Sequence, residues 1–245
     1  MDAATLVAVA HGSRDPRSAA TVHALLDRVR ATAPDLDVRA AFLDLSAPRL
    51  TDVLADVTDA VVVPLLLGSA YHATVDIPGA VSGAIARRPW LTIRVADVLG
   101  PDPRLETAAF GRLLDAGADP DDPELGVVLA GAGSSHAPAN AAVRRVARGW
   151  LPHTRWAGAT AAFAAAADPD VPAATAALRA TGARRIAVGS WFLAPGLLPD
   201  RVAALARDVE RDVVVAEPLG ACAELADVVL GRYASAQIGT DLLVS

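Results

Sequence analysis

The chain has 245 residues, of which 53% are hydrophobic and 20% charged, and this composition predicts a folded chain rather than a disordered one. The net charge of -6 argues against a nucleic-acid partner, because nucleic-acid binding would call for a basic face. The apolar runs are far shorter than the ~20 residues that span a bilayer. With one cysteine and no N-terminal signal pattern, we expect a cytoplasmic protein without a membrane partner.

Apolar, β-branched runs alternate with helical patterns along the chain. The first run is followed by a helix that is expected to begin at Asp15 and Pro16 and that Pro34 ends. This alternation predicts parallel strands joined by right-handed crossovers, with helices on both faces of the sheet. The expected strands are residues 6–10, 37–43, 60–67, 91–96, 125–131, 155–162, 184–193 and 212–216.

The series of elements repeats within the chain. "LVAVAHGS" (6–13) matches "VVLAGAGS" (127–134) at an offset of 121 residues, and Phe42 matches Phe163 at the same offset. Further on, the third strand matches "AVGSWFL" (187–193) at an offset of 126, which indicates a small insertion.

We therefore predict an α/β fold of two similar modules, residues 1–120 and 121–245, each with a parallel four-stranded sheet flanked by helices. The Pro- and Asp-rich segment 117–124 is the expected linker. Two such modules are expected to form a cleft between them.

Two histidines of the first module lie where parallel sheets bind their ligands. His11 directly follows the first strand, and His72 lies just beyond the third. Ligands in such sheets bind outside the carboxyl ends of the strands. The second module has Ala132 in place of His11 and about Leu198 in place of His72. Because both histidines are lost from the same half, we expect the N-terminal module alone to carry the metal chemistry.

Three segments in order resemble the class II chelatases, specifically the sirohydrochlorin chelatases of siroheme and cobalamin synthesis. They are "HGSR" (11–14), "AAFLDLSAPRL" (40–50) and "VVVPLLLGSAYHATVDIP" (61–78), and "SWFLAPGLLPDRV" (190–202) is similar to that family's degenerate second module. The resemblance implies a lyase whose divalent metal is a substrate, Fe2+, Co2+ or Ni2+, with no organic cofactor. Fe2+ is placed ahead of Co2+ because nothing in the chain indicates a dedicated cobalt role.

The resemblance also implies which residues act. His11 and His72 would bind the metal and assist its insertion. Asp44 stands where the family usually has glutamate, and its carboxylate could complete a mixed nitrogen and oxygen metal site. Neutral imidazole suits both tasks, because it binds borderline metals and accepts a proton at cellular pH. The implied partner is sirohydrochlorin or a related polycarboxylate tetrapyrrole, and its carboxylates need local anchoring groups. The candidates are Gly12, Ser13, Arg14 and Arg17.

Other interpretations remain open at this point. Asp44 and Asp76 could be helix N-caps, the strand-end histidine could be a hydrogen-bonded structural residue, and the two arginines could be solvated charges. A histidine phosphatase also has a histidine after its first strand, but the arginine that normally precedes it is Ala10 here. A non-catalytic tetrapyrrole or metal carrier would use the same side chains as a chelatase. His136 and His153 lie in loops with no partner pattern and serve as controls.

Overall fold

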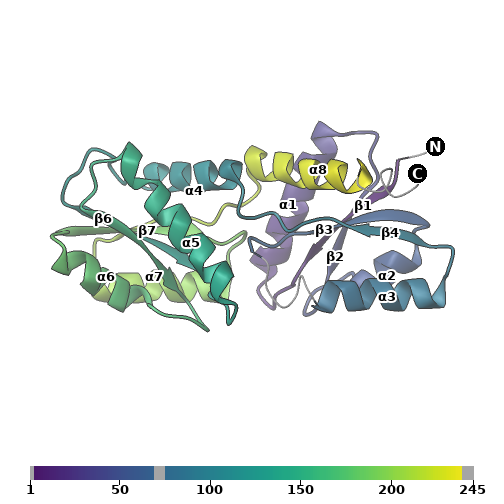
Figure 1. The fold of residues 1–245 in the computed structure, drawn as a ribbon, viewed down its shortest axis with the longest axis horizontal. Coiled ribbons are helices and arrows are strands. Elements are labelled where there is room, and N and C mark those ends of the chain that lie inside the picture. Colours follow the sequence, from purple (N-terminus) through teal and green to yellow (C-terminus); the bar gives the residue numbers. More distant parts are fainter. Residues whose placement is uncertain (1–2, 69–74, 239–245) are drawn as a thin grey trace. The chain divides into compact units, whose positions relative to one another are not determined.

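A computed structural model describes residues 3–68 and 75–238 of the chain. Within those residues, no helix combines the length and the apolar character needed to cross a membrane. The chain divides into two compact units (Figure 1). Unit 1 comprises the described residues up to Asp102 together with those from Ala221 onward, and unit 2 is the continuous stretch Pro103–Gly220.

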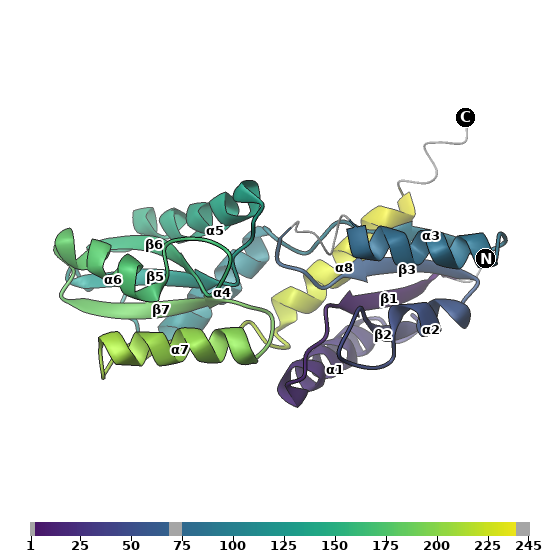
Figure 2. The ribbon, with the colours of Figure 1, turned by 90° about the horizontal axis from the view of Figure 1, so that it is seen from below.

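Unit 1 is a parallel four-stranded sheet covered by helices on both faces. Its elements are β1 (Thr5–Ala10), α1 (Pro16–Thr32), β2 (Val38–Phe42), α2 (Leu50–Ala55), β3 (Asp59–Pro64), α3 (Ile77–Arg87), β4 (Thr92–Val95) and α8 (Ala223–Ile238). The strand order is β2-β1-β3-β4. Helices α1 and α8 pack together on one face, and α2 and α3 pack together on the other (Figures 1 and 2).

Unit 2 has the same architecture. Its elements are α4 (Pro103–Asp115), β5 (Leu125–Gly131), α5 (Ala137–Gly149), a 3-10 turn (Leu151–His153), β6 (Gly158–Phe163), α6 (Val171–Ala180), β7 (Arg185–Trp191), α7 (Leu197–Val209) and β8 (Val214–Val215). The strand order β6-β5-β7-β8 corresponds strand for strand to that of unit 1, and every pairing is parallel. Helices α4 and α5 contact β7 and β6, whereas α6 and α7 pack together against the other face.

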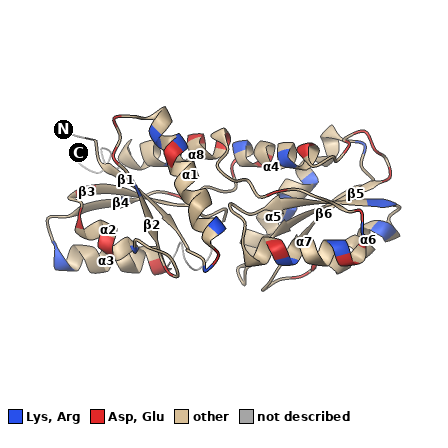
Figure 3. Ribbon diagram, turned by 180° about the vertical axis from the view of Figure 1, so that it is seen from behind, with Lys and Arg blue, Asp and Glu red and all other residues tan. Residues whose placement is uncertain are grey.

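The central strands explain why these segments form sheets. Leu6, Val7, Ala8 and Val9 are at most 1% exposed, because each sheet is covered on both faces. Parallel strands buried on both faces are near-continuous apolar runs, and burying one such aliphatic side chain contributes roughly 1.5–3 kcal/mol. Strands β1 and β5 carry no charged residue, and the charges lie mainly on helices and connecting loops (Figure 3).

The strand register confirms the predicted repeat. Val7 of β1 pairs with Val62 of β3, and Val128 of β5 pairs with Val188 of β7. These partners differ by 121 residues on the first strand and by 126 on the third, as the sequence match requires. All eight expected strands form, and the predicted α/β fold of two similar modules is confirmed. The cleft between them stays a prediction.

The compact units do not coincide with the modules 1–120 and 121–245. Helix α4 precedes the predicted break but packs on β7, and α8, at the other end of the chain, packs on α1 and β3. Two contacts fix α8 in unit 1: the Tyr233 hydroxyl donates to the Ala4 carbonyl (2.6 Å), and Arg232 Nη2 donates to the Leu99 carbonyl (2.9 Å). The two sequence repeats therefore exchange one helix.

Candidate functional site

The candidate site lies at the carboxyl edge of the unit 1 sheet. The strand order places β2 on one side of β1 and β3 on the other, so the connections after β1 and β3 leave toward opposite faces. Sheets of this kind bind ligands at such a switch point. His11 directly follows Ala10, the last residue of β1, and its side chain is exposed there.

Hydrogen bonds join the loop after β1 to the loop after β2. The Asp44 backbone N–H donates to the His11 carbonyl (2.9 Å). The Ser13 N–H donates to Ser46 Oγ, and the Ser46 hydroxyl donates in return to the Ser13 carbonyl, both at 3.1 Å. These contacts hold Asp44 beside His11 before any ligand binds.

Gly12 is required by this contact between loops. Its φ of +94° is unfavourable for residues with a side chain, and a Cβ at this position would lie 1.7 Å from the Asp44 carbonyl oxygen. Leu45 also has a positive φ, of 61°, where the second loop turns back. The close approach at Gly12 is thus to the protein's own backbone, and a contact between Gly12 and a substrate stays a prediction.

A pocket of about 670 Å³ opens at this edge, and we call it the His11 pocket. The described residues that line it are His11, Leu43, Asp44, Arg49, Leu50, Thr51, Asp76 and Ala80. The His11 and Asp44 side chains are both exposed, so a ligand can reach them. The pocket therefore combines an imidazole, two carboxylates and one guanidinium on an apolar floor.

Asp44 is held in its ionised form. Its Oδ1 accepts hydrogen bonds from the Leu45 backbone N–H (2.8 Å) and from Arg49 Nη1 (2.7 Å). The Leu45 N–H, followed by the Arg49 guanidinium, lowers the pKa of the Asp44 carboxyl below its ordinary value. An ionised carboxylate beside an imidazole offers mixed oxygen and nitrogen ligands to a divalent metal.

The structure brings together only part of the predicted metal set. His11 and Asp44 share the pocket, whereas His72 lies outside the described residues. Among residues 3–68 and 75–238, no three His, Cys, Asp or Glu side chains form a group that could hold a metal ion. Asp76 lines the pocket and is the N-cap residue of α3, the position that the sequence predicts, and its side chain makes no capping hydrogen bond there.

The expected anchoring residues have other contacts in this structure. Ser13 Oγ accepts from the Asp15 N–H (3.0 Å), and the Arg17 guanidinium pairs with the Asp15 carboxylate (2.5 Å). Arg14 and Arg17 are not among the described residues that line the His11 pocket. Their role toward a substrate stays a prediction.

Arg49 is the pocket residue that the sequence analysis missed. It directly precedes α2, at a position where the repeat has Asp170 before α6. The sequence signal for Arg49 was that an arginine stands at the position where the second repeat has aspartate, a preferred N-cap residue.

The carboxyl edge of the unit 2 sheet has the same backbone contact between its loops but different side chains at the two matched positions. The Ala165 N–H donates to the Ala132 carbonyl at 2.9 Å, the distance found between Asp44 and His11. Ala132 and Ala165 occupy the positions of His11 and Asp44 at the offset of 121 residues. Alanine offers no side-chain ligand, so these two positions lack the imidazole and the carboxylate found in unit 1.

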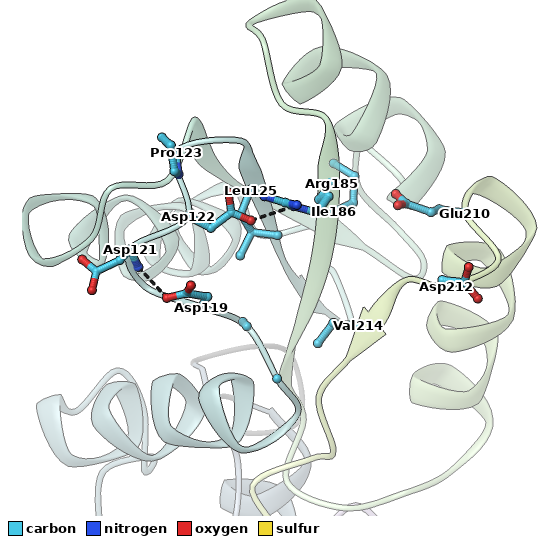
Figure 4. A pocket seen from close by; sticks show the side chains of 12 residues that line it. Asp119, Asp121, Asp122, Pro123, Leu125, Arg185, Ile186, Glu210, Asp212 and Val214 are labelled. Atoms are coloured by element: carbon cyan, nitrogen blue, oxygen red, sulfur yellow. Dashed lines mark hydrogen bonds and ion pairs between the residues drawn. The ribbon is translucent and has the colours of Figure 1, made fainter.

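A second pocket, of about 580 Å³, lies at the opposite edge of the unit 2 sheet, near the amino ends of β5 and β7 (Figure 4). Its acidic residues hold the local structure. Asp122 Oδ1 accepts from Arg185 Nη2 (2.7 Å), and Asp119 accepts from the Asp121 backbone N–H (2.9 Å). We assign no function to this pocket.

The chain is similar to several proteins named as sirohydrochlorin chelatases. The sirohydrochlorin ferrochelatase of Priestia megaterium is 25% identical over 202 residues, which cover 79% of this chain and 74% of that protein. The sirohydrochlorin cobaltochelatase of Methanosarcina acetivorans is 35% identical over 82 residues, 31% of this chain and 63% of the relative. The structure of SirB from Bacillus subtilis with Fe3+ covers 98% of this chain and 97% of SirB, with a TM-score of 0.79 and 23% identity. The CbiX family model matches twice, at residues 5–116 and 126–236, and the chain therefore belongs to the CbiX family.

Proposed function

We propose that this protein is a sirohydrochlorin chelatase, a lyase that inserts Fe2+ or Co2+ into sirohydrochlorin. The observation that carries the proposal is the pairing of an exposed His11 with an ionised Asp44 at the carboxyl edge of the sheet. The relatives named as ferrochelatase and cobaltochelatase support the same activity. Fe2+ comes first in the proposal, and Ni2+ is a third candidate substrate.

For metal insertion, the protein needs to supply ligands for the metal ion and an acceptor for the pyrrole protons. The divalent ion sheds its waters and replaces two pyrrole protons of the ring, so that two protons leave for each ion inserted. The His11 imidazole can hold the ion at the pocket or accept one of these protons. Asp44 supplies negative charge that offsets the charge of the ion. His72 is the proposed second histidine of this step.

Substrate binding needs positive charge near the pocket. Sirohydrochlorin is polycarboxylate, and the protein has a net charge of -6. Gly12, Ser13, Arg14 and Arg17 remain the proposed contacts of the substrate's carboxylates. Such charge-assisted hydrogen bonds are stronger than neutral ones.

Turnover tests the proposal. The purified protein is mixed with sirohydrochlorin and either Co2+ or, under anaerobic conditions, Fe2+, and metallation is followed by absorbance. We expect an initial rate that exceeds the uncatalysed rate and saturates with sirohydrochlorin. Binding without a rate increase would instead show a tetrapyrrole carrier. Turnover of Co2+ or Ni2+ without Fe2+ would overturn the placing of Fe2+ first.

A further inference from the structure

Arg49 occupies a position where local structure favours a different residue. It is the N-cap of α2 and makes no capping hydrogen bond with its side chain. Ser, Thr, Asp and Asn are strongly preferred at such positions. The repeat follows this rule, because Asp170 is the N-cap of α6 and its Oδ1 accepts from the Ala173 N–H (2.9 Å). A residue that breaks a local preference is expected at functional sites.

The turn itself does not need an arginine. In unit 1 the Phe42 N–H donates to the Pro48 carbonyl, and in unit 2 the Phe163 N–H donates to the Pro169 carbonyl, both at 2.9 Å. The same backbone contact thus forms with arginine or with aspartate as the next residue. The arginine is therefore not explained by the path of the chain.

The Arg49 side chain contacts Asp44 within the pocket through only one of its three guanidinium nitrogens. Its Nη1 donates to the Leu43 carbonyl (2.9 Å) and to Asp44 Oδ1 (2.7 Å). Toward the described part of the chain, Nε and Nη2 make no hydrogen bond, and the side chain is 48% exposed. Arginine has five N–H donors in a rigid fork, so the Nε and Nη2 edge can still bind a planar anion.

The proposed substrate supplies such an anion, because sirohydrochlorin is a polycarboxylate. Asp44 and Asp76 line the pocket and would repel a polycarboxylate ligand, while Arg49 is the one guanidinium among its described lining residues. We infer that Arg49 is a substrate-binding residue: it contacts a carboxylate of the tetrapyrrole through Nε and Nη2 while Nη1 keeps Asp44 in place. This inference rests on the proposed function and adds a contact that none of the predicted anchoring residues provides.

Replacement by serine separates binding from folding. Arg49→Ser removes the guanidinium but installs a preferred N-cap residue, so its melting temperature should not fall below that of the wild type. Affinity for sirohydrochlorin, titrated by absorbance without metal, should fall about tenfold or more, the effect typical of a lost hydrogen bond to a charged group. KM should rise in parallel, with a smaller change in kcat. Arg49→Lys keeps the charge without the fork and should lie between the two.

Arg39→Ser is the matched control. Arg39 also pairs with an aspartate, Asp37 (2.9 Å), and donates to a backbone carbonyl, that of Asp56, but it lies near the start of β2. Its affinity for sirohydrochlorin should equal that of the wild type.

Other outcomes would overturn the inference. Unchanged affinity in Arg49→Ser with a lower kcat would mean that Arg49 acts through Asp44 alone. If the serine variant does not fold, wild-type affinity in Arg49→Lys would show that the fork is not used. A wild type that binds sirohydrochlorin without turnover would contradict the proposed chelatase, and the affinities would still test Arg49. A wild type that does not bind sirohydrochlorin at all would overturn both.

Discussion

The carboxyl edges of the two units have the same backbone and different side chains. The loops after the first two strands share the same backbone hydrogen bond of 2.9 Å in both units, between Asp44 and His11 in unit 1 and between Ala165 and Ala132 in unit 2. The fold thus provides the same edge twice, and at these two matched positions only unit 1 has an imidazole and a carboxylate, His11 and Asp44, where unit 2 has Ala132 and Ala165.

The similarity extends to packing behind the loops. Phe42 and Phe163 are buried at equivalent strand ends, at 1% and 2% exposure. The ring centroids of His23 and Phe42 lie 6.1 Å apart in an edge-to-face arrangement. The Arg144 Cζ atom lies over the Phe163 ring, 5.0 Å from its centroid. His23 and Arg144 are themselves 121 residues apart, so unit 2 serves as a built-in control for unit 1.

Removing the histidine of unit 1 should have the largest effect. His11→Ala removes a metal ligand or proton acceptor, and losing a positioned proton acceptor typically lowers the rate ~100- to 10,000-fold. Because the side chain is exposed, the melting temperature should stay near that of the wild type. His72→Ala should behave in the same way. Initial rates of metallation measure the effect.

His136→Ala and His153→Ala in unit 2 are the controls for these two variants and should keep near-normal rates. A loss of activity in either control, with normal rates for both unit 1 variants, would place the chemistry in the other unit.

Variants of Gly12 and Gly133, the equivalent loop glycines of the two units, distinguish an effect on stability from an effect on activity. An added Cβ would lie 1.7 Å from the Asp44 carbonyl oxygen in Gly12→Ala and 1.9 Å from the Ala165 carbonyl oxygen in Gly133→Ala. Each variant should be destabilised in urea unfolding by at least about 1–3 kcal/mol, the usual cost of a strained backbone. Only Gly12→Ala should also lose metallation activity, because it displaces the loop that carries Asp44. Equal activity in the two variants would contradict the asymmetry.

Changes at Asp44 should have a smaller effect than loss of His11. Asp44→Ala should lower the metallation rate roughly tenfold, in the range found for groups that tune a metal site from beside the ligands. Asp44→Glu keeps the charge and restores the family's usual residue, so it should remain active. The reciprocal variant Ala165→Asp should add no activity to His11→Ala, since unit 2 has no imidazole at Ala132. A gain of activity there would show that unit 2 can supply a site.

The smallest effect concerns the pH dependence of stability at the N-terminus of the helix that follows the first strand of each unit. Asp15 caps α1, and the Arg17 side chain lowers the pKa of the Asp15 carboxyl. Its contribution to stability is therefore present above the ordinary pKa of about 3.9 and is lost as the pH falls through the lower folded value. Asp15→Ala should destabilise the protein at pH 7 and match the wild type near pH 2. His136, the N-cap of α5, makes no side-chain cap, so His136→Ala should show no such dependence.

Much of the fold could be predicted because its signals are local. Strands buried on both faces are apolar runs, and the repeat at an offset of 121 residues doubled the evidence for each. Local signals could not predict which sheet α4 and α8 pack against. An amphipathic pattern shows which face of a helix is buried, such as Leu225 and Val229 of α8, but not which sheet covers it.

The site was predictable to the extent that it follows strand ends. His11 directly follows β1, and Asp44 comes shortly after the end of β2, so the sheet itself places them at one edge. The contact of Arg49 with Asp44 depends on how the chain turns before α2, and no periodicity describes that turn. Gly12 was predicted to contact the substrate, and the close contact that the structure shows is instead with a carbonyl oxygen from another loop, which sequence spacing cannot reveal.

The packing of α8 on unit 1 has a consequence for the order in which the protein folds on the ribosome. Domains generally fold from the N-terminus as synthesis proceeds. Here the contact between Tyr233 and Ala4 spans 229 residues, so the first sheet to be synthesised keeps one face incomplete until the last helix has left the ribosome. Unit 2 is a continuous stretch and can close earlier. The sheet that holds His11 and Asp44 is thus covered completely only after unit 2 has been synthesised.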